Sequence, residues 1–135
     1  VEHQAHLRLA RMGFQVARTG YNDPWDLRCE GVKVEVKGAT YRSRRYQAAI
    51  RNHQADVLLF GCKRPQADGG DLVFFVIPAR AYAHTNNIAV WTRDPADYQG
   101  QWCEYYRAWW LMDAIVSRLP AYVGWQPALF QEIAL

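Results

Sequence analysis

The sequence predicts an α/β protein whose central mixed β-sheet is flanked by helices. Short segments that alternate apolar and polar residues, typical of half-buried strands, occupy the first third of the chain. Two continuous apolar runs of strand length follow, and segments with helical periodicity occur near both ends. With 135 residues, half of them apolar, the chain is large enough to bury a continuous core. We therefore expect a single domain over residues 1–135.

The chain is expected to begin with a helix over residues 2 to 12. Its apolar residues recur at helical spacing: Ala5, Leu9 and Met12. Gly13 supplies the C-terminal stop. Glu2 extends the same face, and a carboxylate there is unusual without a partner, because an unpaired buried charge is costly. A short strand over residues 14 to 18 and a loop rich in Gly, Asn, Asp and Pro follow.

A β-hairpin is predicted next. Residues 25 to 30 and 32 to 37 both alternate apolar with mostly charged side chains, and the Glu30-Gly31 pair between them favours a tight turn. Side chains with period two project to the same face, so one face of the hairpin is apolar and the other is charged. The charged face carries three residues of chemical interest: Asp26, Glu35 and Lys37.

The later elements are expected to complete the sheet and to cover it. Residues 41 to 53 suit either a strand or a helix, and we favour a strand. Two apolar runs predict central strands covered on both faces, at residues 57 to 60 and 72 to 77. The remaining predicted elements are a helical turn at 79 to 84, a strand at 88 to 92, a loop at 94 to 100 and a longer helix at 104 to 119.

Positive charge is concentrated in one part of the chain. The net charge of the whole chain is +3, yet residues 28 to 64 hold nine Lys and Arg against three Asp and Glu, which gives +6. Such a segment is expected in a protein that binds a polyanion, although a solvated face explains it as well when the charge stands alone. Four arginines are the expected phosphate contacts: Arg42, Arg44, Arg45 and Arg51.

Asp26 and Glu35 are candidate ligands of a divalent cation. On neighbouring strands their side chains converge, and the backbone carbonyl of Val36 adds a further oxygen. Mg²⁺ prefers few protein oxygens, several waters and a substrate phosphate, and we expect Mn²⁺ to substitute. Lys37 is spaced to orient a water and to counter charge on a phosphate, as phosphodiester hydrolysis requires. The simpler alternative is a solvent-facing hairpin with ion pairs such as Asp26 with Lys37.

The hairpin and the loop before it contain two short motifs: Pro24-Trp25-Asp26 and Glu35-Val36-Lys37. They resemble the active-site pattern of the PD-(D/E)XK nucleases, a family of restriction enzymes, Holliday junction resolvases and some homing endonucleases. One departure is Trp25, which separates the proline from the aspartate but leaves the carboxylate in place. The resemblance covers residues 2 to 80 and implies a restriction-endonuclease-like core, with residues 81 to 135 as a helical extension.

This resemblance implies a metal-dependent DNA endonuclease with Asp26, Glu35 and Lys37 as catalytic residues. It further implies that Glu2 joins the metal site, directly or through a water, and that Gln47 assists after the E-x-K strand. Two other classes stay open. One is a catalytically inactive nucleic-acid-binding domain of the same fold, which the intact catalytic trio opposes. The other is an interaction domain whose basic segment binds a different acidic partner.

Composition argues against several other kinds of protein. The three cysteines are far apart and form no metal-binding spacing, and His3 and His6 belong to no zinc motif, so we expect both histidines at the surface or a pocket rim. No apolar run reaches about 18 residues and no signal peptide is recognisable, so we expect a cytoplasmic protein of prokaryotic or phage origin. One active site per chain predicts that double-strand cleavage requires a homodimer, a higher homo-oligomer or successive nicks.

Overall fold

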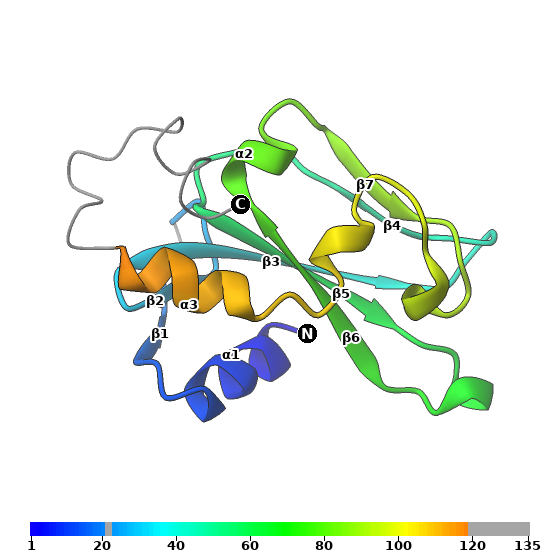
Figure 1. Ribbon diagram of the computed structural model, residues 1–135, viewed down its shortest axis with the longest axis horizontal. Coiled ribbons are helices and arrows are strands. Elements are labelled where there is room, and N and C mark those ends of the chain that lie inside the picture. Colours follow the sequence, from blue (N-terminus) through cyan, green and yellow to red (C-terminus); the bar gives the residue numbers. More distant parts are fainter. Residues whose placement is uncertain (21–22, 119–135) are drawn as a thin grey trace.

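The computed structural model of the protein describes residues 1–20 and 23–118. Its strands form a five-stranded mixed sheet in the order β1-β2-β3-β5-β6 and a separate two-stranded sheet, β4-β7 (Figure 1). β3 and β5 are parallel, and the other neighbouring strands are antiparallel. The elements are α1 (Glu2–Arg11), β1 (Val16–Arg18), β2 (Leu27–Cys29), β3 (Val32–Thr40), β4 (Tyr46–Ala49), β5 (Val57–Lys63), β6 (Leu72–Pro78), α2 (Ala79–Tyr82), β7 (Asn87–Val90) and α3 (Trp110–Ser117), with short 3-10 turns η1 (Gln66–Asp68), η2 (Pro95–Asp97) and η3 (Cys103–Tyr105).

The described elements confirm the expected α/β class with a central mixed sheet flanked by helices. Figure 1 shows α1 and α3 toward one side of the central sheet, and α2 with the β4-β7 pair toward the other. Buried residues from both sheets and all three helices form one hydrophobic cluster. No helix among the described residues is long and apolar enough to cross a membrane.

The first helix and the hairpin follow the sequence pattern closely. α1 buries Ala5 and Leu9, and Gly13 follows it with a φ of 93°. The hairpin turn places Glu30 at a φ of 50° and Gly31 at 84°, the left-handed pair that a tight two-residue turn requires. Both predictions are confirmed.

The strand predicted at residues 72 to 77 was expected to be central, and this was wrong in one respect. β5 lies between β3 and β6, whereas β6 is an edge strand of the five-stranded sheet. Its outer edge is partly covered by the segment before α3, where Tyr106 forms a β-bridge with Phe75 and the Arg107 amide donates to the Phe74 carbonyl at 2.9 Å. Partial pairing and burial of both faces make an edge strand resemble a central one in sequence.

The strand favoured within residues 41 to 53 is confirmed as β4, but it belongs to the second sheet. β3 and β4 are joined by a tight turn in which Arg42 and Arg45 form a bridge. Ser43 and Arg44 occupy the turn with φ values of 54° and 63°, and a left-handed backbone is strained for residues with a side chain. After this turn β4 leaves β3 and pairs with β7 instead.

The long helix predicted from residue 104 is shorter in the structure. A 3-10 turn ends at Tyr105, and α3 begins only at Trp110. Between them the helix is interrupted: Tyr106 forms a bridge with the edge of β6, and Arg107 lies in a turn with a φ of 50°. The end of the predicted helix at residue 119 and the tail after it lie outside the described residues.

Candidate active site

The start of β2 and the middle of β3 bring Asp26 and Glu35 together. Leu27 on β2 is paired with Val34 on β3, and Asp26 and Glu35 each lie one residue beyond this pair, where the regular pairing of the two strands ends. The Asp26 carboxylate is fixed at Oδ2, which accepts a hydrogen bond from the Val36 amide at 2.7 Å. The Asp26 amide in turn donates to the Val34 carbonyl at 2.9 Å. Backbone hydrogen bonds therefore hold this carboxylate beside β3.

Glu35 is a buried charged residue with only 7 % of its surface exposed. The pKa of Glu35 is raised from 4.5 to about 8, mainly by burial and then by a hydrogen bond to the Asp26 side chain and by the Asp26 charge. The charge of Lys37 and a hydrogen bond from Asn52 act in the opposite direction. Two carboxyl groups in hydrogen-bonding contact at a buried position repel each other when both are ionised, and a cation relieves that repulsion.

Lys37 and the Val36 carbonyl border the carboxyl pair. Lys37 is half-buried and lies two residues after Glu35 on the regular strand β3, so both side chains leave the same face of the sheet. The amide and carbonyl of one strand residue point to the same side of the strand. Since the Val36 amide contacts Asp26, the Val36 carbonyl also faces the Asp26 side. The E-x-K pattern thus has the arrangement expected of it.

Asn52, rather than the expected Gln47, contacts the carboxyl pair. The Asn52 side-chain amide donates to Glu35 Oε2 at 3.5 Å. Gln47 lies on the exposed side of β4 and donates to Asn87 Oδ1 at 2.8 Å. Gln47 was expected at the site because it follows the E-x-K strand at short distance. However, β4 pairs with β7 instead of β3, which takes Gln47 away from Glu35. The chain returns to Glu35 only after β4, at Asn52. No local sequence signal distinguishes Asn52 from other polar residues of this segment.

Glu2 is half-buried in the first turn of α1 and does not complete a three-carboxylate site. Within residues 1–20 and 23–118 no group of three or more His, Cys, Asp and Glu side chains is placed to hold a metal ion. The start of α1 lies on the other face of β3, because the Val1 side chain is 3.0 Å from the position of a Cβ on Gly38, which has the opposite orientation to Glu35. Direct ligation by Glu2 is therefore not supported, and a role through water stays a prediction.

Basic side chains extend along the same face of the hairpin. Arg28 on β2 is paired with Lys33 on β3, and both lie over the ring of Trp25, at 5.5 Å and 4.7 Å from its centroid. These cation–π contacts hold two positive charges close to the residues that carry the carboxyl pair. Trp25, which separates Pro24 from Asp26, therefore holds Arg28 and Lys33 beside the site.

The four arginines expected to contact phosphate lie on and after the β3-β4 turn. Arg42, Arg44 and Arg51 are exposed, and Arg45 is half-buried with its guanidinium 4.9 Å from the centroid of the Trp91 ring. A depression of about 350 Å³ runs between the turn and the end of β3. It is lined by Gly38, Ala39, Thr40, Arg42, Ser43, Arg45 and Gln47. Gly38 directly follows Lys37 in the chain, but Asp26, Glu35 and Lys37 do not line this depression.

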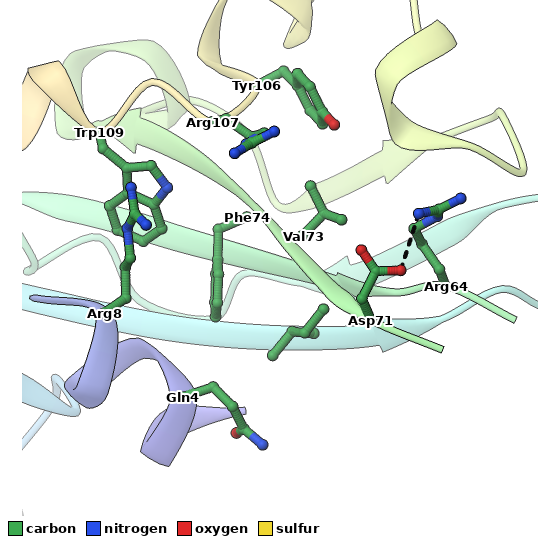
Figure 2. A pocket seen from close by; sticks show the side chains of 10 residues that line it. Gln4, Arg8, Arg64, Asp71, Val73, Phe74, Tyr106, Arg107 and Trp109 are labelled. Atoms are coloured by element: carbon green, nitrogen blue, oxygen red, sulfur yellow. Dashed lines mark hydrogen bonds and ion pairs between the residues drawn. The ribbon is translucent and has the colours of Figure 1, made fainter. Parts of the chain in front are cut away.

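A separate cavity of about 480 Å³ lies among α1, the ends of β5 and β6, and the segment before α3 (Figure 2). Figure 2 shows Arg8 stacked on Trp109, at 5.0 Å from the ring centroid, and Arg64 paired with Asp71 at 3.0 Å. None of the residues lining it belongs to the Asp26–Glu35 site, so the candidate active site is not this cavity.

Comparison with known proteins agrees with the fold. Neither the models of protein families nor the sequences of curated proteins give a match to the chain. Among solved structures, the fold is similar to that of I-Ssp6803I, described as a bacterial homing endonuclease, with a TM-score of 0.69 and 20% sequence identity. The similarity covers 90% of this chain and 91% of that chain. The chain therefore has the fold of this nuclease over nearly its whole length.

Proposed function

We propose that the protein is a metal-dependent DNA endonuclease of the PD-(D/E)XK type. The observation that carries the proposal is the contact of the buried Glu35 carboxyl group with the half-buried Asp26, with Lys37 on the same face of the sheet as Glu35. This environment raises the pKa of Glu35 from 4.5 to about 8. A purely structural ion-paired hairpin would not bury a carboxyl group against another one, because that arrangement is costly. The similarity in fold to a homing endonuclease agrees with the proposal.

The donor set fits Mg²⁺, with Mn²⁺ as a substitute. Two carboxylates and one backbone carbonyl, from Asp26, Glu35 and Val36, are hard oxygen donors, and Mg²⁺ characteristically uses one or two carboxylates together with waters and substrate phosphate. A third acidic residue is therefore not required. The chemistry that Mg²⁺ supplies when bound is Lewis acidity toward a phosphate oxygen and an attacking water.

The chain's own residues have distinct roles in this proposal. The Val36 amide orients Asp26, and Asn52 orients Glu35, so neither carboxylate has to reorganise when substrate binds. Lys37 donates hydrogen bonds to the attacking water or the scissile phosphate and counters the negative charge that develops there. The arginines of the β3-β4 turn bind phosphates of the DNA backbone, and Arg42 and Arg45 also line the depression beside the turn.

The proposal is tested by a cleavage assay on supercoiled plasmid, linear duplex, branched and single-stranded DNA with Mg²⁺, Mn²⁺ or Ca²⁺. We expect cleavage with Mg²⁺ and Mn²⁺, and a loss of about 100-fold or more in Lys37→Ala. Lys63→Ala is the matched control, because Lys63 is exposed at the end of β5. Salt-sensitive DNA binding without cleavage in any metal would establish the inactive binding domain instead. Equal activity of the two lysine variants would refute the assignment of the site.

A further inference from the structure

The outer face of the β4-β7 pair has the chemistry of a surface that contacts base edges. In the register of the pair, Gln47 is opposite Ala89 and Ala49 is opposite Asn87. Side chains alternate along each strand, so the residues between these point inward, where Ile88 and Val90 are fully buried. The outward residues form two cross-strand pairs, Gln47 with Ala89 and Ala49 with Asn87, and next to them Arg45 lies over the Trp91 ring. We call these six residues the ribbon face.

The amides of the ribbon face are paired with each other and still have hydrogen-bonding capacity. Gln47 Nε2 donates to Asn87 Oδ1 at 2.8 Å, and both residues are exposed. This bond leaves the Gln47 carbonyl as an acceptor and the Asn87 amide as a donor, side by side. Adenine presents the complementary pair, the N7 acceptor and the N6 donor, in the major groove of duplex DNA. The alanines opposite the two amides carry only a methyl group, which leaves room for a close approach.

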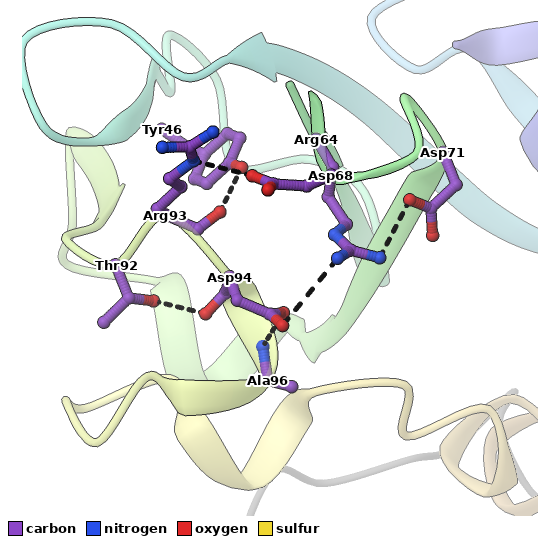
Figure 3. Close-up of polar contacts among 8 residues, drawn as sticks. All are labelled: Tyr46, Arg64, Asp68, Asp71, Thr92, Arg93, Asp94 and Ala96. Atoms are coloured by element: carbon purple, nitrogen blue, oxygen red, sulfur yellow. Dashed lines mark hydrogen bonds and ion pairs between the residues drawn. The ribbon is translucent and has the colours of Figure 1, made fainter. Parts of the chain in front are cut away.

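The ribbon face is rigid and flanked by positive charge. On its underside the Tyr46 hydroxyl donates to the Arg93 carbonyl at 2.6 Å, and Arg93 pairs with Asp68 at 2.6 Å (Figure 3). These contacts fix β4 to the segment after β7 and to the η1 turn. Arg45 lies over Trp91 at the turn end of the face, and the exposed Arg42 and Arg44 lie in the turn. The six residues of the face include no acid, as a partner with a phosphate backbone requires.

We propose that the ribbon face enters the major groove of the DNA substrate and that Gln47 and Asn87 contact an adenine there, which makes the enzyme sequence-specific. A two-stranded ribbon fits the major groove, which is about 12 Å wide. Arg42, Arg44 and Arg45 then contact the adjoining phosphates. The depression between the turn and the end of β3 lies beside this groove contact, because Arg42, Arg45 and Gln47 line it. This inference rests on the proposed endonuclease function, whereas Gln47 acts here in recognition and not in catalysis.

The test compares wild type with the Gln47→Ala/Asn87→Ala double variant in selection from a pool of duplex DNA with a randomised central segment, in Ca²⁺. Asn86→Ala is the matched control, because Asn86 is exposed and lies just before β7, outside the ribbon face. We expect wild type and control to enrich duplexes with an A·T pair at one or two adjacent positions. We expect the double variant to lose this preference and to bind the selected duplex roughly 10- to 100-fold more weakly.

Additional measurements separate the two proposals. The double variant should keep the wild-type thermal stability and the wild-type dependence of non-specific affinity on salt, because no phosphate contact is removed. Unchanged base preference in the double variant, or a wild type that cleaves plasmid with Mg²⁺ but selects no sequence, would overturn the ribbon inference and leave the nuclease proposal standing. A wild type that neither binds nor cleaves DNA would overturn both.

Discussion

Replacing Glu35 with glutamine should stabilise the metal-free protein at neutral and alkaline pH. An amide has the shape of the protonated carboxyl group and can keep both the contact with Asp26 and the hydrogen bond from Asn52. In the wild type the pKa of Glu35 lies at about 8 instead of 4.5, so the folded chain holds a proton that the unfolded chain releases. The stabilisation that the folded wild type gains from keeping this proton is complete below about pH 4.5 and is lost as the pH rises to about 8.

The size of the effect follows from the same values. At roughly 1.4 kcal/mol for each pH unit, the full difference between the pKa values of Glu35 in the unfolded and folded chain corresponds to roughly 5 kcal/mol. Water that enters the open side of the pair screens part of it, so we expect Glu35→Gln to exceed wild type by about 2–4 kcal/mol at pH 9 and to equal it near pH 5. In a domain of this size the gain in Tm is roughly 10 °C.

The assay is thermal and urea unfolding in EDTA from pH 5 to pH 9, with Asp97→Asn as the control at an exposed carboxylate. Added Mg²⁺ should raise the stability of wild type at pH 8, because the cation binds the ionised pair, and should leave Glu35→Gln almost unchanged. Parallel pH profiles for wild type and Glu35→Gln would refute the reasoning, since they would mean that burial and the contact with Asp26 do not perturb Glu35.

Three further predictions concern DNA binding, Glu2 and packing. In Ca²⁺, Arg44→Ala should flatten the slope of log affinity against log salt by about 0.9, whereas Lys37→Ala should leave most of the salt dependence in place; equal slopes for wild type and Arg44→Ala would exclude a phosphate contact. Glu2→Ala should slow cleavage without lowering Tm, and a lower Tm alone would make the residue structural. Gly61→Ala should cost about 1–3 kcal/mol in urea unfolding, because the new Cβ would lie 2.9 Å from the Phe74 ring; unchanged stability would contradict this packing.

Local sequence patterns were sufficient for the elements that build the carboxyl pair. Period-two alternation on both sides of Glu30-Gly31 specified the hairpin and the face that carries Asp26 and Glu35, because side-chain direction in a strand depends only on position along it. The helical periodicity and Gly13 specified α1 in the same way. The pairing of two strands that are adjacent in sequence is therefore enough to predict that the carboxylates of Asp26 and Glu35 lie near each other.

Tertiary structure decided which other residues reach the site. The partner of β4 is β7, some 40 positions away, and this long-range pairing removes Gln47 from Glu35 and brings Asn52 to it. The placement of the start of α1 against the opposite face of β3 is likewise a result of tertiary packing. Strand partners and helix packing depend on burial against elements distant in sequence, so neither can be predicted from local periodicity. The outward pairing of Gln47 with Asn87, on which the proposed base contact depends, exists only once that long-range sheet has formed.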